Sequence, residues 1–162
     1  MIQAITTLFE HNFIQRERMN RMLRQLTHEE LNRDFVAQAS IIRVLHHIAA
    51  TEHYWIGSVL GHKYEEEEIA SGGLELDEVM RYWKKVEMGT RDYLGTLNES
   101  RLAYVISVQW PIGTVSFTVG KALLHLASHE VHHRGQIAIL MRLLGYEPPV
   151  VDMIQSPECE IE

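Results

Sequence analysis

The chain has 162 residues, which fits a single domain spanning residues 1–162 with a substantial hydrophobic core. Its composition is 46% hydrophobic and 23% charged, with a net charge of −7, so the sequence lacks the basic balance typical of a nucleic-acid-binding protein. No basic leader or sustained apolar run predicts membrane insertion. The only cysteine, Cys159, excludes an internal disulfide and a cysteine-based zinc site, and we expect a cytoplasmic location.

Apolar residues recur at helical spacing in four long segments, and each segment predicts a helix. Glycines or prolines that end helices follow two of them. The predicted helices and their stop signals, in chain order, are residues 2–26, residues 40–60 followed by Gly61, residues 76–97, and residues 118–144 followed by Gly145, Pro148 and Pro149. Helices of this number and length predict an all-α fold, a four-helix bundle.

The segments between these helices have a different composition. Residues 27–31 (THEEL) indicate a polar turn or the capped start of a helix. Residues 63–73 form a charged, glycine-ended connection. Residues 103–119 are rich in β-branched and aromatic side chains around a proline and a glycine, which predicts an irregular loop or a short hairpin. The last ten or so residues are expected to form an extended tail.

Ten histidines are the unusual feature of the composition, and four of them lie in the stretch HLASHEVHHRGQI, residues 125–137. This stretch contains the pattern H-E-x-x-H, which on a helix is typical of a zinc peptidase. The extended peptidase pattern needs glycine at position 136 and histidine at position 139. Gln136 and Ile139 stand there instead, so the sequence argues against a peptidase.

Helical periodicity places His129 and His133 on an apolar stripe of the fourth helix, one turn apart. His47 lies at the edge of the apolar stripe of the second helix. Buried imidazoles need partners, and a metal ion satisfies several of them at once. The alternative is a chance H-x-x-x-H spacing in a histidine-rich chain, with His47 only hydrogen-bonded at the edge of its helix. The other histidines away from this helix, expected at the surface, are His11, His28, His46, His53 and His62.

The segment VLHHIAATEHYW (residues 44–55), followed downstream by HLASHEVHHRGQIAILMRLLGYEPPVVDMI (residues 125–154), resembles the DinB/YfiT-like superfamily of small metal-binding four-helix-bundle proteins. The start, TLFEHNFIQRERMNRML, is similar to the first helix of that family. The resemblance implies a divalent metal ion, zinc or nickel, held by His47, His129 and His133. The helical periodicity selects the same three residues.

A site with three nitrogen ligands leaves a position for water or substrate, which is typical of catalytic metal sites. Characterised relatives in the superfamily include transferases that use a low-molecular-weight thiol such as bacillithiol, and a mycothiol-dependent isomerase. By resemblance we expect a metal-dependent enzyme, a thiol S-transferase or a hydrolase, acting on a small-molecule substrate with that thiol as a possible cofactor. The alternative is a non-enzymatic stress-response module, in which the metal staples helices together and apolar faces pair two chains into a homodimer.

Two residues beside the predicted ligands are candidates for supporting roles. Glu130 follows His129 on the flank of its helix, where it could serve as a catalytic base or orient a ligand, or form a salt bridge at the helix surface. Gln136 lies about one turn beyond His133 and could hydrogen-bond an imidazole.

Glu52 and the tryptophans complete the set of candidates. Glu52 falls on the apolar stripe of the second helix, which indicates either a role in supporting the metal site or an internal salt bridge, for example with Arg134 or Arg91. Trp55 and Trp83 are expected in the core, and Trp110 is the best candidate for lining a pocket.

Overall fold

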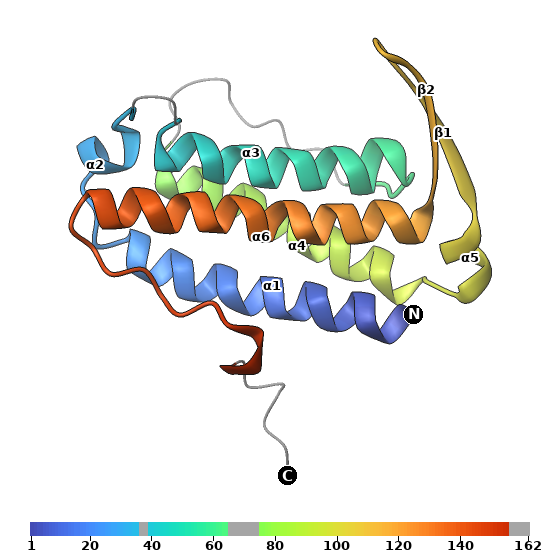
Figure 1. Cartoon of the computed structure of the whole chain (residues 1–162), viewed down its shortest axis with the longest axis horizontal. Coiled ribbons are helices and arrows are strands. Elements are labelled where there is room, and N and C mark those ends of the chain that lie inside the picture. Colours follow the sequence, from blue (N-terminus) through green and yellow to red (C-terminus); the bar gives the residue numbers. More distant parts are fainter. Residues whose placement is uncertain (36–38, 65–74, 156–162) are drawn as a thin grey trace.

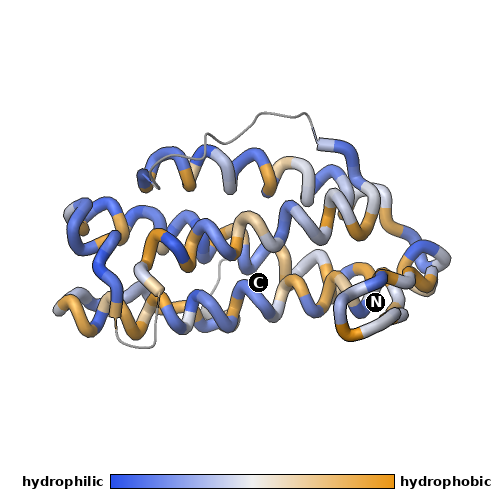
Figure 2. Tube along the Cα trace, turned by 90° about the horizontal axis from the view of Figure 1, so that it is seen from above, coloured by the Kyte–Doolittle hydropathy of each residue, from blue (hydrophilic) through white to orange (hydrophobic). Residues whose placement is uncertain are grey.

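The structure, a computed structural model, describes residues 1–35, 39–64 and 75–155 of the chain. Four long helices, α1 (Ile2–Leu23), α3 (Ile41–His53), α4 (Leu76–Gly95) and α6 (Val119–Leu143), pack side by side (Figure 1). Hydrophobic positions recur along each of them (Figure 2), and the buried ones face the neighbouring helices. Helices α1, α4 and α6 coincide with those predicted from the sequence to within a few residues at each end, whereas α3 ends at His53 and not near residue 60.

Local sequence signals explain how the chain turns after each of the first two long helices. After α1, a short helix α2 (His28–Asn32) starts with a capping box, in which Thr27 and Glu30 satisfy each other's backbone N–H groups. A π-helical turn, η1 (Tyr54–Val59), continues α3 in the same direction. Gly61, with φ of +81°, then turns the chain away.

Residues between α4 and α6 form a short helix and a β-hairpin. Helix α5 (Glu99–Ala103) is followed by antiparallel strands β1 (Val105–Trp110) and β2 (Gly113–Thr118). The hairpin stands above the helices at one end of the molecule (Figure 1). The hairpin alternative predicted for this segment is therefore confirmed. The strictly all-α class is not confirmed, because the fold is mostly helical with a small two-stranded sheet.

After α6, the chain turns back and contacts α2. Gly145, with φ of +88°, ends α6, and the hydroxyl of Tyr146 donates to the carboxylate of Glu30 in α2. A short 3₁₀ helix, η2 (Met153–Gln155), ends the described part. Most of the predicted connection at 63–73, and Cys159 in the tail, lie outside the described residues.

A buried polar layer separates two apolar clusters in the core. One cluster gathers around Met19, Leu45 and Ile137, and the other around Phe9, Leu123 and the hairpin end. Between them lie polar and charged side chains from all four long helices: Asn12, Gln15, Arg16, Glu52, Glu87, Thr90, Glu130 and Arg134. Among the described residues, no helix is both long enough and apolar enough to cross a membrane.

Candidate functional site

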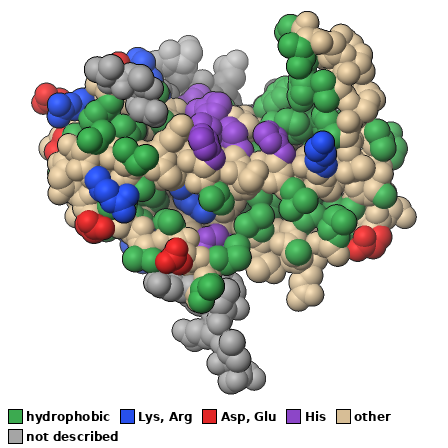
Figure 3. Space-filling view, in the orientation of Figure 1, with side chains coloured by type: hydrophobic (Ala, Val, Ile, Leu, Met, Phe, Trp, Pro, Cys, Tyr) green, Lys and Arg blue, Asp and Glu red, His purple; other side chains and the backbone are tan. Residues whose placement is uncertain are grey.

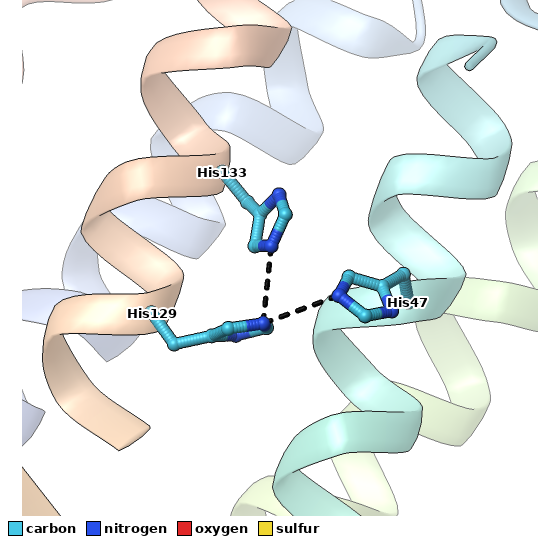
Figure 4. Close-up of side chains that lie close together, drawn as sticks. All are labelled: His47, His129 and His133. Carbon is cyan, nitrogen blue, oxygen red and sulfur yellow. Dashed lines mark hydrogen bonds between the residues drawn. The ribbon is translucent and has the colours of Figure 1, made fainter. Parts of the chain in front are cut away.

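Three histidines from two helices converge on the side of the molecule where α3 and α6 meet. His47 comes from α3, and His129 and His133 come from α6, where their spacing puts them one helical turn apart. The Nε2 atom of His129 lies 3.1 Å from Nε2 of His47 and 3.0 Å from Nε2 of His133 (Figure 4). Each side chain offers a ligand atom within 4.8 Å of the other two. The fold therefore brings together the three residues predicted from the sequence.

The protonation of these rings suits metal ligation. Burial, together with the neighbouring rings of His133 and His47, lowers the pKa of His129 to about 4. Burial also lowers the pKa of His133, although a hydrogen bond to Gln136 acts in the opposite direction. Both imidazoles are therefore neutral near pH 7, the state in which histidine binds a metal.

A hydrogen bond to Gln136 fixes which nitrogen of His133 faces the cluster. The Nδ1 atom of His133 lies 2.7 Å from Oε1 of Gln136. Because an amide oxygen can only accept, His133 donates through Nδ1 and turns the lone pair of Nε2 toward His129. The predicted hydrogen bond between Gln136 and an imidazole is confirmed. Within the described residues, the buried Nδ1 atom of His129 has no such partner.

The donor set fits a divalent transition metal. Facing lone pairs on neutral imidazoles repel each other unless a proton or a cation lies between them. Zinc and nickel accept imidazole nitrogen readily, whereas calcium and magnesium prefer oxygen ligands. The cluster formed by His47, His129 and His133 could hold such an ion.

The exposure of the two α6 histidines differs from the prediction. His129 and His133 are half-buried at the edge of the helix interface, and His47 is exposed. The buried stripe of α6 is rotated toward Glu130 and Arg134, which are each only 3% exposed. The predicted core position of the histidines is therefore wrong, because two charged residues that neutralise each other occupy the core in their place.

Arg16 of α1 is the centre of this buried charge network. Its guanidinium donates to both carboxylate oxygens of Glu130 on α6, with distances of 2.6 to 3.1 Å, and to the carboxylate of Glu52 on α3. Arg134 donates to Glu130 at 3.0 Å and to the side-chain oxygen of Asn12 at 2.9 Å. The network therefore ties α1 to both helices that carry the histidines.

Glu130 lies in a different place from the one predicted. It lies in the core rather than at the helix surface, and both of its oxygens accept from arginine. Burial by itself raises the pKa of this carboxyl, but the charges and hydrogen bonds of Arg16 and Arg134 outweigh it and hold the pKa below the usual range. A carboxylate so engaged is a poor proton acceptor, and its surroundings do not support a role as a catalytic base.

Glu52 forms the internal salt bridge predicted for it, but with Arg16 rather than with Arg134 or Arg91. The hydroxyl of Thr90 also donates to Glu52, at 2.6 Å. Burial raises the pKa of Glu52, and the charge of Arg16 acts against this shift. Glu52 does not belong to the three-histidine cluster.

Arg16 and Asn12 are the residues that the sequence analysis missed. The buried apolar stripe of α1 contains Ile5, Phe9 and Met19 at helical spacing. Asn12 and Arg16 occupy the two places in that stripe where apolar residues would be expected, and both are buried. Polar residues on an otherwise apolar stripe are the signal that could have identified them.

The remaining histidines only partly follow the surface prediction. His28 is exposed as expected, whereas His11 is buried. His46, His53 and His62 are half-buried. The ring of His53 is hydrogen-bonded at Nδ1 to the hydroxyl of Tyr82, 2.9 Å away, and burial lowers its pKa.

Known proteins match this chain over most of its length. The sequence matches the DinB family over residues 1–162. The uncharacterized protein YizA of Bacillus subtilis (strain 168) is 30% identical over 144 residues, which cover 86% of this chain and 87% of YizA.

Two crystal structures have a similar fold. A DinB-like protein from Bacillus cereus ATCC 10987 has a TM-score of 0.68 and 25% identity, covering 93% of this chain and 94% of that one. The DinB-like protein YjoA from Bacillus subtilis has a TM-score of 0.65 and 18% identity, covering 90% and 97% of the two chains. The match over the whole sequence shows that this chain belongs to the DinB family.

Proposed function

We propose that this protein is a metal-dependent enzyme in which His47, His129 and His133 hold a zinc or nickel ion and leave a position open for substrate. The observation that carries the proposal is the convergence of three Nε2 atoms at a half-exposed edge between α3 and α6. Structural zinc sites usually have four protein ligands in a closed shell, whereas catalytic sites have three. Within the described residues the cluster has three members, and one of them is exposed.

When bound, such an ion lowers the pKa of a water or thiol ligand and so supplies a nucleophile near neutral pH. The residues of the chain hold the site in shape. Gln136 fixes the ring of His133, and Arg16 joins the helices that carry the histidines. Exposed His47 leaves an approach from solvent.

The chemistry that we propose is transfer of a low-molecular-weight thiol, such as bacillithiol, to an electrophilic small molecule. Its support is the resemblance to thiol-dependent relatives and the open position of a three-histidine site. Hydrolysis is the other enzymatic reaction that this site suits. We further propose that the protein is cytoplasmic.

A non-enzymatic function is the second candidate. The outer face of α6 carries Val131, Ile139 and Leu143, which are 45%, 57% and 63% exposed. Exposed apolar side chains on one helix face favour pairing with a second chain. In this alternative the metal staples α3 to α6, and the protein acts as a homodimeric module.

Metal content tests the site itself. Protein purified without added metal is measured by elemental analysis and then titrated with zinc and nickel by calorimetry. We expect one ion per chain in the wild type and none in His47→Ala or His133→Ala. His46→Ala is the matched control, because it removes a neighbouring imidazole that lies outside the cluster. If both ligand variants retain the ion, the proposed three-histidine metal site is wrong.

A turnover assay distinguishes the proposed enzymatic function from the non-enzymatic alternative. The metal-loaded protein is incubated with a panel of low-molecular-weight thiols and the electrophile monochlorobimane, and the conjugate is measured by fluorescence. We expect a rate that is lost in His133→Ala. If no thiol gives a rate above that of the variant, transferase activity is rejected. Sedimentation of the wild type and of Ile139→Glu then tests the dimer.

A further inference from the structure

An aromatic surface begins directly beside the three-histidine cluster. His125 precedes His129 by one turn on α6, and the centres of their rings lie 6.1 Å apart. On its other side, the ring of His125 lies 5.1 Å from that of Trp55 in η1. His125 is exposed, so this ring is accessible from solvent. A single ring therefore separates Trp55 from the candidate metal ligands.

The β-hairpin extends this surface away from α6. The centre of the Trp55 ring lies 5.4 Å from that of Phe117 of β2 and 6.1 Å from that of Trp110 of β1. The rings of Trp110 and Phe117 stack on each other, 6.2 Å apart with an angle of 24° between their planes. Both rings are only half-buried, although they are among the largest apolar side chains of the protein. Part of each ring is therefore left uncovered.

The two faces of the hairpin differ in composition. Strand alternation places Trp110 and Phe117 on one face, together with the facing pair Val108 and Val115. The opposite face carries exposed polar residues such as Gln109. Because Trp55 links the apolar face to His125, this face is turned toward the histidines. Hydrophobic side chains of the hairpin and the histidines lie on the same side of the molecule in Figure 3.

We propose that His125, Trp110 and Phe117, which pack around the buried ring of Trp55, form the binding surface for a flat aromatic or conjugated part of the substrate, whose metal-binding atom lies at the three histidines. This inference rests on the proposed metal site. None of the four side chains carries a carboxylate or an ammonium group, so the surface favours an apolar ring over an ionic group. Small-molecule sites are typically lined in this way, by aromatic side chains beside a few polar groups that fix orientation.

The test uses three hydroxamic acids that share one metal-binding group and differ only in the attached part. Acetohydroxamic, benzohydroxamic and 2-naphthohydroxamic acid are titrated by calorimetry into the zinc-loaded protein. We expect the naphthyl compound to bind at least about tenfold more tightly than the methyl compound, since burial of the ring adds binding energy. The measured quantity is this affinity ratio.

Variants on the two faces of the hairpin test whether the aromatic surface causes the difference in affinity between the naphthyl and methyl compounds. Trp110→Leu and Phe117→Leu keep apolar bulk but remove a ring, and we expect each to reduce the ratio to within about threefold without changing the affinity for acetohydroxamic acid. Gln109→Ala, on the opposite face of the same strand, should keep the full ratio. Thermal unfolding checks that each variant is folded. If Trp110→Leu does not fold, the affinity ratio of Phe117→Leu decides the test.

The outcomes separate this inference from the metal site. Failure of the wild type to bind zinc overturns the proposed function and the inference with it. Zinc binding with equal affinities for the three compounds overturns the inference alone. A ratio that persists in both Trp110→Leu and Phe117→Leu also overturns it, because the ring then binds elsewhere.

Discussion

Replacing Arg16 by methionine should destabilise the protein severely, because Arg16 is the cation shared by three buried carboxylates. Its side chain is 3% exposed, so solvent does not screen its interactions. A hydrogen bond between charged groups contributes about 1.5–3 kcal/mol, and removing one partner of a buried ion pair costs about 3–5 kcal/mol. Glu130 keeps Arg134 as a partner, whereas Glu52 keeps neutral donors such as Thr90. We therefore expect a loss of about 3–5 kcal/mol, most of it from Glu52.

The assay is urea unfolding followed by far-UV circular dichroism near neutral pH, with a chelator present so that metal binding does not contribute. Arg16→Met, Glu52→Gln and the double variant form a cycle. Since the single Arg16 variant leaves a buried charge on Glu52, the double variant should be more stable than additivity predicts by more than about 1 kcal/mol. A loss below about 1 kcal/mol for Arg16→Met, or strict additivity, would refute the reasoning.

Three further measurements follow from the structure. A Cβ atom added by Gly89→Ala would lie 2.2 Å from the ring of Tyr64, so we expect a loss of about 1–3 kcal/mol in urea unfolding. Gly135→Ala meets nothing within 4 Å and should instead stabilise α6 by up to about 1 kcal/mol; stabilisation by both variants would contradict the Gly89–Tyr64 contact. Removal of metal by a chelator should lower the melting temperature of the wild type, since an ion at about 100 times its Kd stabilises by about 2.7 kcal/mol, and should leave His133→Ala unchanged. An equal shift in both proteins would count against the histidine site. The pKa of Glu130 is lowered in the folded state, so its stabilisation is complete above the ordinary value of 4.5 and is lost as the pH falls through the lower folded value. The stability difference between wild type and Glu130→Gln should therefore narrow below about pH 4.5, and a constant difference down to about pH 3 would contradict the assignment.

Element boundaries could be predicted because their causes are local. Gly61 and Gly145 adopt positive φ where α3–η1 and α6 end, and only glycine does so without strain. Thr27 and Glu30 cap α2 through side chains three residues apart. Each signal depends on a few neighbouring residues and not on the rest of the fold.

The rotation of α6 could not be predicted from its own sequence. Leu126 and Ile137 lie on the buried stripe whether its centre falls near His133 or near Glu130. The expectation that charged residues avoid the core then favoured the histidines. The burial of Glu130 becomes intelligible only with Arg16, which is 114 residues away in the sequence. A partner at that separation leaves no periodic signal on α6.

The buried charges explain why the histidines lie at an edge. Rotation of α6 that places Glu130 against Arg16 turns His129, the preceding residue, toward the boundary with α3. Had the histidines occupied the core stripe, side chains from the other helices would have closed the cluster on every side. At the boundary, His47 is exposed and the cluster remains open to solvent. The same carboxylate that is too well paired to act as a base is therefore the residue that keeps the three imidazoles accessible.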